Sequence, residues 1–410
     1  MQQPALLGGP ATRTAAFPAW PPVTDSAVKA VSDAVRAGVW GAADGALKVA
    51  FEERFAAYHD ARYGIAVNNG TVSLQIALAA LGVGSGDEVI VPAYTFLATA
   101  TAVLEVNALP VFVDVDPATA TIDPAAVEAV ITDRTKVIVP VHLGGQPADL
   151  DRLMALAHRH GLKVLEDAAQ AHGASWNGHR VGSIGAFGSF SFQASKNLTS
   201  GEGGILTTND EALAELAWSM HHCGRSRSGR WYEHAILGGN HRMTELQAAL
   251  LLDQLGTAEE QLARRERSAA ILDRELAAVE GLIPMGRAAG TTHHAYHLYQ
   301  LRYDAAGFGG VTKERFLEAM AAEGIPCSAG YGVPLDRQPV FAKHAFDVRA
   351  TGYDPAYPPT KYGALDLPAT EALCREAVWI PQNVLLGEDS DMADIVAAAT
   401  KVRATAAQLA

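Results

Sequence analysis

The stretch "YGIAVNNGTVSLQIALAALGVGSGDEVIVP", residues 63–92, decides the fold class. Its two ends are short apolar runs that predict buried strands. Between them, apolar residues recur at the spacing of one helix face until Gly82 ends the pattern. A strand, a helix and a second strand in this order build parallel sheets. The stretch therefore predicts an α/β fold.

The same alternation continues along the chain. Further apolar runs predict strands over residues 109–115, 136–141 and 162–167. We expect one mainly parallel central sheet flanked by helices, in a large domain over residues 1–254 that begins with an N-terminal arm. In such sheets, ligands bind beyond the carboxyl ends of the strands, which is where functional residues are expected.

The pattern becomes helical after residue 210. Residues 243–279 predict one long helix or two consecutive helices broken near Gly256, and residues 293–304 alternate like a strand. A further helix is predicted over residues 312–327. We therefore expect a smaller C-terminal α+β domain over residues 255–410.

Composition argues against several classes of protein. The 410 residues are 49% hydrophobic and 19% charged, and the net charge of −13 is spread without a long block, which argues against a nucleic-acid partner. Three widely spaced cysteines give neither a disulfide framework nor a zinc pattern. The first residues lack the features of a signal peptide, and the longest uncharged run, residues 89–104, is too short to span a membrane. We expect a cytoplasmic protein without membrane contact or bound metal.

A lysine stands in an unusual setting in "SFQASKNLTSGEGG", residues 191–204. Lys196 follows a strand-like aromatic run and leads into a glycine-rich loop. Most lysines are solvated surface residues, but a buried lysine amine can be held neutral enough to attack a carbonyl. Asp167 ends the strand over residues 162–167 and so lies at the edge where ligands bind, although a helix cap would also account for it.

Asn69, Gly70 and Thr71 open the helix after the first strand, where free backbone N–H groups suit either a phosphate or a side-chain cap. Pyridoxal phosphate needs an anion cradle, a carboxylate for its ring nitrogen, a lysine for its aldehyde and a flat partner for its ring. Residues 69–71, Asp167 and Lys196 match the first three, and Tyr94 in "VPAYTF" matches the fourth. The set predicts a pyridoxal 5'-phosphate site.

The sequence resembles the DegT/DnrJ/EryC1/StrS family of pyridoxal-phosphate-dependent aminotransferases, which make amino sugars and aminocyclitols and have the aspartate aminotransferase fold of type I. The resemblance covers nearly the whole chain. It rests on the blocks "NNGTVSLQIALAALGVGSGDEVIVPAYTF", "VFVDVDPATATIDP", "VIVPVHLGGQPADLD", "LEDAAQAHGA", "FSFQASKNLTSGEGG" and "GGNHRMTELQAALLLDQL".

The resemblance implies a role for each matching residue. Lys196 matches the Schiff-base lysine, which also shuttles protons, and Asp167 matches the partner of the ring nitrogen. For the phosphate, the resemblance implies Gly70, Thr71 and Ser191, and for the ring it implies Tyr94 and Gln170. It also implies that Asn240 reaches the phosphate of the cofactor bound in the other subunit. A residue that reaches across implies a homodimer with shared active sites.

The resemblance also implies the reaction. An amino group would pass from L-glutamine or L-glutamate to the keto group of a cyclitol or keto-sugar, both small molecules, in antibiotic-type biosynthesis. Three alternatives stay open: an aromatising enzyme like 3-amino-5-hydroxybenzoate synthase, a deoxysugar dehydratase, and a non-catalytic sensor that keeps the cofactor. Lys196 speaks against the dehydratase branch, where some members have histidine at this position.

The acceptor is less clearly indicated. His294 and His297 match acceptor-binding positions of the sugar branch, or are alternate exposed residues of a strand. Tyr331 lies in a segment that resembles the substrate-facing loop of the family. Arg225 and Arg227, with Arg230, would meet a sugar-nucleotide diphosphate or belong to a solvated loop. "CREAVWIPQNVLLGEDSDM" resembles the cyclitol branch and "AYHLY" the nucleotide-sugar branch, so both acceptors stay open.

Overall fold

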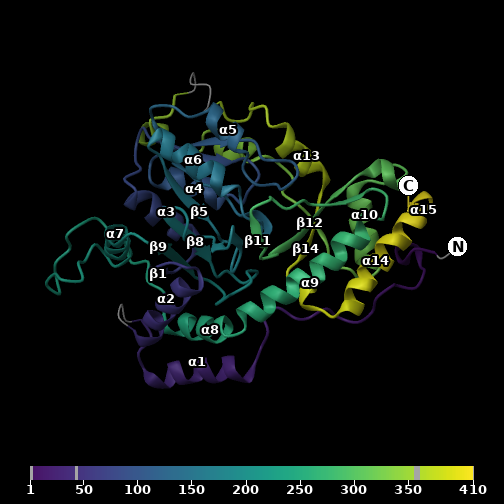
Figure 1. Ribbon diagram of the computed structural model, residues 1–410, viewed down its shortest axis with the longest axis horizontal. Helices are drawn as coiled ribbons and strands as arrows, with labels where there is room; N and C mark the ends of the chain where they lie inside the picture. The colour runs from purple at the N-terminus through teal and green to yellow at the C-terminus, as the bar shows by residue number, and fades with distance from the viewer. Residues whose placement is uncertain (1–2, 42–44, 355–360, 410) are drawn as a thin grey trace.

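The computed structural model describes residues 3–41, 45–354 and 361–409. Its central feature is a seven-stranded sheet (Figure 1). In spatial order its strands are β1 (Tyr63–Val67), β9 (Gly204–Thr208), β8 (Phe187–Ser191), β5 (Lys163–Asp167), β4 (Thr135–Ile138), β2 (Glu88–Pro92) and β3 (Leu109–Val113). Pairing is parallel from β8 through to β3 and antiparallel on both sides of β9. The predicted mainly parallel sheet is confirmed.

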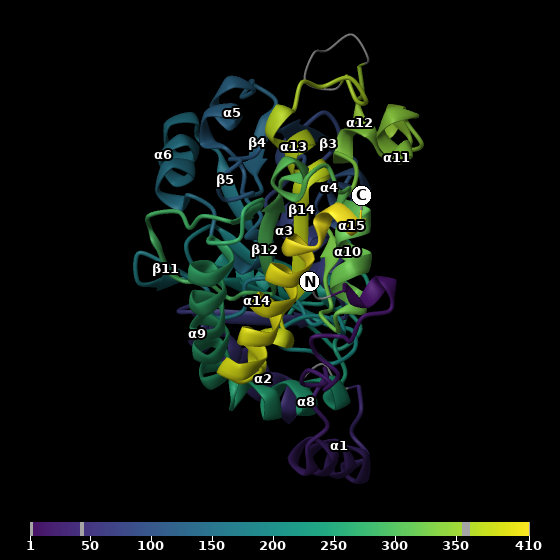
Figure 2. The same ribbon diagram turned by 90° about the vertical axis from the view of Figure 1, so that its right-hand side faces the viewer.

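Helices cover both faces of this sheet because successive strand residues point to opposite sides. Val89 and Val91 of β2 belong to a core shared with α3, α4 and α7, whereas Ile90 between them belongs to a core shared with α5 and α6. Figure 2 shows α5 and α6 on one side of β4 and β5, with α4 on the other. The helices of this part of the chain are α1 (Asp25–Ala37), α2 (Ala46–Tyr58), α3 (Gly70–Ala80), α4 (Ala98–Glu105), α5 (Pro124–Ala129), α6 (Leu150–His160), α7 (Glu211–His221) and α8 (Glu245–Leu255).

A second, antiparallel sheet lies in the C-terminal part of the chain. Its strands, in spatial order, are β10 (Leu282–Pro284), β12 (Leu298–Tyr303), β14 (Ala377–Pro381) and β13 (Ser328–Ala329). The helices that follow α8 are α9 (Ala258–Leu276), α10 (Lys313–Ala322), α11 (Pro339–Ala342), α12 (Val348–Thr351), α13 (Pro368–Glu376), α14 (Asp389–Ala404) and α15 (Ala406–Leu409). Helices α9, α10 and α14 share a core with this sheet. The predicted break between two helices is confirmed, since α8 ends just before Gly256.

The single strand predicted over residues 293–304 is wrong at its start. β11 (Thr291–His293) pairs with β6 (Ser175–Trp176), which also pairs with β7 (His179–Arg180), and β12 begins only at Leu298. Between them Tyr296 has φ +45°, a left-handed conformation that interrupts a strand. The apolar alternation therefore runs across two different sheets.

The division of the chain at residues 254 and 255 stays a prediction, and two segments extend across it. Phe341 and Tyr362 pack into the core of the seven-stranded sheet. Leu6 and Phe17, near the N-terminus, pack against the core of the four-stranded sheet. Within the described ranges, no helix is long and apolar enough to cross a membrane.

Candidate active site

A cleft of about 1220 Å³ lies between the two large sheets. One wall comes from segments that follow the carboxyl ends of β1, β2, β5 and β8, as expected for a parallel sheet. The other wall comes from β12, from β14 and from Tyr331, and Trp20 of the N-terminal arm also lines the cleft. The predicted site residues that line it are Gly70, Thr71, Asp167, Gln170, Ser191, Lys196, His297 and Tyr331.

The start of α3 forms one end of the cleft. The Asn69 side chain caps this helix, because its Oδ1 accepts a hydrogen bond from Val72 N at 2.9 Å. Gly70 and Thr71, the first two residues of the helix, face the cleft together with Ser191 at the end of β8. Asn69 is thus a cap, while the two residues after it present a helix N-terminus, a setting that suits an anion.

Asp167 is the last residue of β5 and is only 5% exposed. Its Oδ2 accepts a hydrogen bond from Thr99 Oγ1 at 2.8 Å, and its Oδ1 accepts one from Ala169 N at 3.2 Å. Burial raises the pKa of the Asp167 carboxyl, while these two bonds and the charge of Lys196 oppose the rise. The carboxylate therefore lies in the cleft wall with partners that favour its charged form.

Lys196 follows β8 after a tight turn in which its backbone N–H donates to Gln193 O at 2.9 Å. Burial lowers the pKa of its amine to about 8, and the charge of Asp167 limits the fall. A lysine with such a pKa carries a larger fraction of neutral amine at pH 7 than a surface lysine does. Neutral amine is the nucleophilic form that attacks a carbonyl carbon.

The structure contradicts the expectation that Tyr94 covers a bound ring. Tyr94 is 1% exposed and is packed against Tyr331 and Trp379, with ring centroids 5.4 Å and 6.4 Å away, so it does not line the cleft. Phe96, two residues further along the same loop, lines the cleft and is 61% exposed. Phe96 is therefore the aromatic side chain of this loop that can contact a ligand.

Gln170 and Tyr331 lie next to one another in the cleft. Gln170 Oε1 accepts a hydrogen bond from Gly144 N at 2.6 Å, and the Gln170 side chain bonds the Tyr331 hydroxyl. The Tyr331 ring meets Trp379 edge to face, with centroids 4.9 Å apart. This arrangement joins the wall that carries Asp167 to the wall of the second sheet.

The two predicted histidines behave differently. His297 lines the cleft, and its Nδ1 lies 3.2 Å from Asn197 Oδ1. His294 stacks on Tyr296 with ring centroids 3.8 Å apart and lines a separate small cavity, so it does not reach the cleft. Both side chains are buried, which overturns the alternative that they are exposed residues of a strand. Burial lowers the pKa of both imidazoles well below its usual value.

Arg225, Arg227 and Asn240 lie outside the cleft of their own chain, in the segment between α7 and α8. Figure 1 shows this segment projecting beside α7, away from the sheet. Arg227 pairs with Glu215 at 2.9 Å and lies over the Trp218 ring, and Arg225 lies over Trp231. Asn240 is exposed. The arginines therefore cannot meet a ligand in the cleft of the same chain.

Sequence reasoning missed three residues that the geometry brings to the site: Phe96, Thr99 and Trp379. A signal existed for Thr99, since a threonine in the first turn of a helix that follows a strand end lies near the ligand-binding edge. Trp379 belongs to the second sheet, and no local pattern relates it to Lys196. Among the described residues, no group of three or more His, Cys, Asp or Glu side chains is arranged to hold a metal ion.

Comparison with known proteins gives a consistent result. The model of the DegT/DnrJ/EryC1/StrS aminotransferase family matches residues 22–400. An L-glutamine:2-deoxy-scyllo-inosose aminotransferase of Micromonospora echinospora is 40% identical over 432 residues, which cover 99% of each chain. The enzyme with the same name in Streptomyces paromomycinus is 39% identical over 420 residues, 97% of each chain.

Solved structures agree with these relatives. The crystal structure of 3-amino-5-hydroxybenzoic acid synthase superposes with a TM-score of 0.85 at 35% identity and covers 96% of this chain and 100% of its own. The match spans both sheets and therefore the cleft between them. The resemblance inferred from the sequence is confirmed: this chain belongs to the DegT/DnrJ/EryC1/StrS aminotransferase family, whose members depend on pyridoxal phosphate.

Proposed function

We propose that this chain uses pyridoxal phosphate to move the amino group of L-glutamine to the keto group of a cyclitol. One observation carries the proposal: Lys196, with a pKa lowered to about 8, lines the same cleft as the buried carboxylate of Asp167. The relatives named for L-glutamine and 2-deoxy-scyllo-inosose support the choice of donor and acceptor.

The residues present fit this cofactor. Gly70 approaches Ser191 so closely that a Cβ on Gly70 would lie 2.7 Å from Ser191 Cβ, so a glycine is needed where the phosphate cradle closes. Thr71 adds a hydroxyl at the same end of the cleft, Phe96 adds a flat apolar surface, and Gln170 adds an amide beside Asp167. We assign the phosphate to Gly70, Thr71 and Ser191. We assign the ring to Phe96 and Gln170.

The chemistry then follows from two side chains. When bound, the cofactor's pyridine ring supplies a sink for the electrons released at the donor's α-carbon. Asp167 would accept a hydrogen bond from the protonated ring nitrogen, and its negative charge would stabilise that proton, as opposite charges do at short distance. Lys196 Nζ would hold the cofactor, and the same amine would take a proton from the donor's α-carbon. Its pKa of about 8 suits it both to accept and to return a proton.

The charges of the cleft favour a cyclitol over a nucleotide-linked sugar. Among the described residues that line it, Lys196 is the one lysine or arginine, and Asp167 and Glu202 are acidic. A diphosphate requires cations for tight binding, and the nearby amide side chains of Gln193, Gln382 and Asn383 suit uncharged hydroxyl groups instead. The charge of the lining therefore supports a cyclitol as the acceptor.

The proposal is tested by half-reactions. The purified protein with bound cofactor is mixed with L-glutamine, and the visible absorbance is followed without acceptor. We expect the yellow band to decay, more slowly with L-glutamate, and to return when 2-deoxy-scyllo-inosose is added. Lys196→Ala should show neither change. A yellow band that no amino acid alters would reject transamination and favour a sensor, and a water-loss product without nitrogen transfer would favour the aromatising enzyme or the dehydratase.

We also propose that the active unit is a homodimer in which Asn240 completes the partner's phosphate site. The exposure of Asn240 and its place outside its own cleft support this. Mixing inactive Lys196→Ala with inactive Asn240→Ala should restore about a quarter of the activity, since half of the molecules are hybrids that each hold one intact site. Activity that stays absent after subunit exchange would reject the shared site.

A cytoplasmic location is part of the same proposal. Cys223, Cys327 and Cys374 are free thiols, which is typical of proteins in a reducing compartment. Fractionation of the producing cells should place the protein with cytoplasmic markers.

A further inference from the structure

The last two residues of β5 face opposite ways. Asp167 faces the cleft, and Glu166, the residue before it, is fully buried on the other side of the strand. A fully buried carboxylate is costly unless its oxygens are paired. The partners of Glu166 are therefore informative about what holds Asp167.

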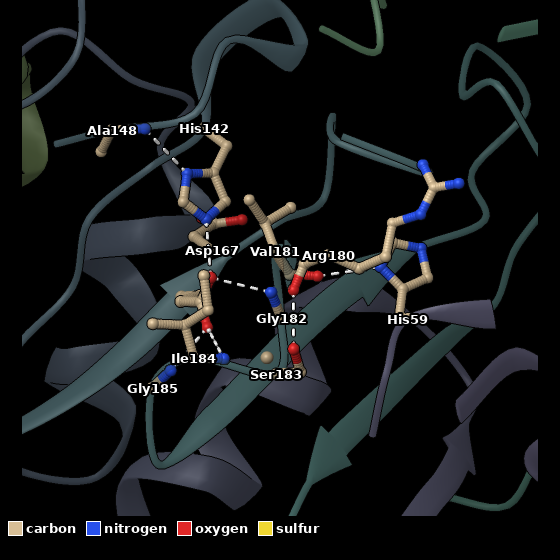
Figure 3. Close-up of polar contacts among 12 residues, drawn as sticks. His59, His142, Ala148, Asp167, Arg180, Val181, Gly182, Ser183, Ile184 and Gly185 are labelled. Carbon is tan, nitrogen blue, oxygen red and sulfur yellow. Dashed lines mark hydrogen bonds and ion pairs between the residues drawn. The ribbon is translucent and has the colours of Figure 1, made fainter. Parts of the chain in front are cut away.

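Glu166 binds a loop that follows β7. Its Oε1 accepts hydrogen bonds from Ile184 N at 2.9 Å and Gly185 N at 2.7 Å, and its Oε2 accepts one from Gly182 N at 2.7 Å. The Oε2 atom also lies 3.1 Å from Nε2 of His142. Figure 3 shows the bond from His142 coming from above, the bond from Gly182 from one side, and the bonds from Ile184 and Gly185 from below. Both oxygens are thus paired.

His142 contacts the end of β5 in two ways. Ala148 N donates to His142 Nδ1 at 3.1 Å, so the ring proton is on Nε2 and is donated to Glu166. The backbone N of His142 also donates to Asp167 O at 3.0 Å, while Asp167 N donates to Pro140 O at 2.9 Å. His142 therefore holds the backbone of Asp167 through its own main chain. It holds the side chain of Glu166 through its imidazole.

We propose that His142 and Glu166 are positioning residues for Asp167, which orient its carboxylate toward the ring nitrogen of the cofactor. A binding group must be held within about 0.5 Å of its productive place, and the bonds from Thr99 and Ala169 N to the Asp167 oxygens achieve this only if the strand end itself is fixed. The bond between His142 and Glu166 prevents the strand end from tilting on the side away from the cleft. The inference rests on the proposed function, since it concerns the same carboxylate.

Two substitutions separate this role from a general structural one. His142→Gln places an amide N–H near the position of Nε2 and keeps the bond to Glu166, but loses the acceptor for Ala148 N. His142→Asn places an oxygen near the position of Nδ1 and keeps that acceptor, but loses the bond to Glu166. His59→Gln is the matched control, because His59 is equally buried and bonds Val181 O rather than Glu166.

The readout is the affinity of the cofactor-free protein for pyridoxal phosphate and for its 1-deaza analogue, which lacks the ring nitrogen. We expect His142→Asn to bind pyridoxal phosphate roughly tenfold more weakly, a loss typical of residues that orient a direct ligand. His142→Gln and His59→Gln should stay within about threefold of the parent, and the analogue should bind all three variants as it binds the parent.

Equal losses in both His142 variants, or an equal loss for the analogue, would overturn the positioning role. If His142→Asn does not fold, Glu166→Asp replaces it, because the shorter side chain cannot reach both His142 and the amides of residues 182–185. The affinities of this variant for pyridoxal phosphate and for the 1-deaza analogue then test the positioning role. A parent protein that binds the analogue as tightly as pyridoxal phosphate would instead reject the proposed function, since Asp167 then makes no contact with the ring nitrogen.

Discussion

Thr99 Oγ1 donates a hydrogen bond to Asp167 Oδ2 at 2.8 Å, and this bond joins the first turn of α4 to the end of β5. Burial raises the pKa of Asp167, and the Thr99 hydroxyl is the largest influence in the opposite direction. The two residues are 68 positions apart, and the parallel pairing of β2, β4 and β5 brings their segments to one edge. The charge of Asp167 thus depends on a neighbouring element.

Thr99→Val should move the pH dependence of the reaction with L-glutamine. Without the hydroxyl, the carboxylate form is stabilised less, so the pKa of Asp167 rises further. A larger fraction is then protonated at a given acid pH, and the acid limb of kcat/KM shifts to higher pH. Thr101→Val is the control, because the Thr101 hydroxyl bonds Leu97 O and not Asp167. An unchanged acid limb in Thr99→Val would mean that this bond does not govern the charge of Asp167.

Gly70→Ala should weaken the binding of pyridoxal phosphate by tenfold or more with little change in the far-UV spectrum. The added Cβ would lie 2.7 Å from Ser191 Cβ, so the start of α3 or the end of β8 must shift and the phosphate cradle widens. The control is Gly84→Ala, where a Cβ meets nothing within 4 Å. Titration of the two cofactor-free variants with pyridoxal phosphate measures both affinities. Equal affinity in the two variants would remove Gly70 from the cradle.

Phe96→Ala should weaken cofactor binding by roughly fivefold, because an aromatic contact contributes about 0.5–1.5 kcal/mol beyond its area. Tyr94→Leu, which removes the aromatic ring, should leave the affinity unchanged, since Tyr94 does not line the cleft. Quenching of protein fluorescence by added pyridoxal phosphate measures both variants. The opposite ranking would return the ring-stacking role to Tyr94.

The sequence predicts the large sheet well for a physical reason. Strands buried on both faces are continuous apolar runs, and β1 and β2 lie at the two apolar runs that begin and end residues 63–92. Asp167 and Lys196 could be singled out because Asp167 ends such a run and Lys196 comes a few residues after another. Local pattern and tertiary structure agree in these places.

The errors lie where the backbone leaves a repeating conformation. Residues 93–97 connect β2 to α4 without periodicity, so the sequence cannot show that Tyr94 turns into the core and Phe96 toward the cleft. The left-handed Tyr296 interrupts an apolar alternation that otherwise reads as one strand. Trp379 reaches the cleft only through the packing of the second sheet, which no short stretch encodes.

Lys196→Met should stabilise the cofactor-free protein at pH 7, because the native state holds a charged amine in a partly buried place. The pKa of Lys196 falls from 10.5 to about 8 on folding, so below pH 8 the amine is charged in both states and the full cost of its burial is present. As the pH rises from 8 to 10.5, the folded state releases its proton first and the cost disappears. The gain should therefore be about 3 kcal/mol at pH 7 and close to zero near pH 10.5. Urea unfolding at pH 7 and at pH 9.5 measures this gain in stability, with Lys163→Met as the control because Lys163 is exposed.

A gain that does not shrink with pH would show that Lys196 lowers stability through its shape and not through its charge. A gain that shrinks would show that the stability lost by holding this amine in the cleft is what gives it a pKa suited to the reaction.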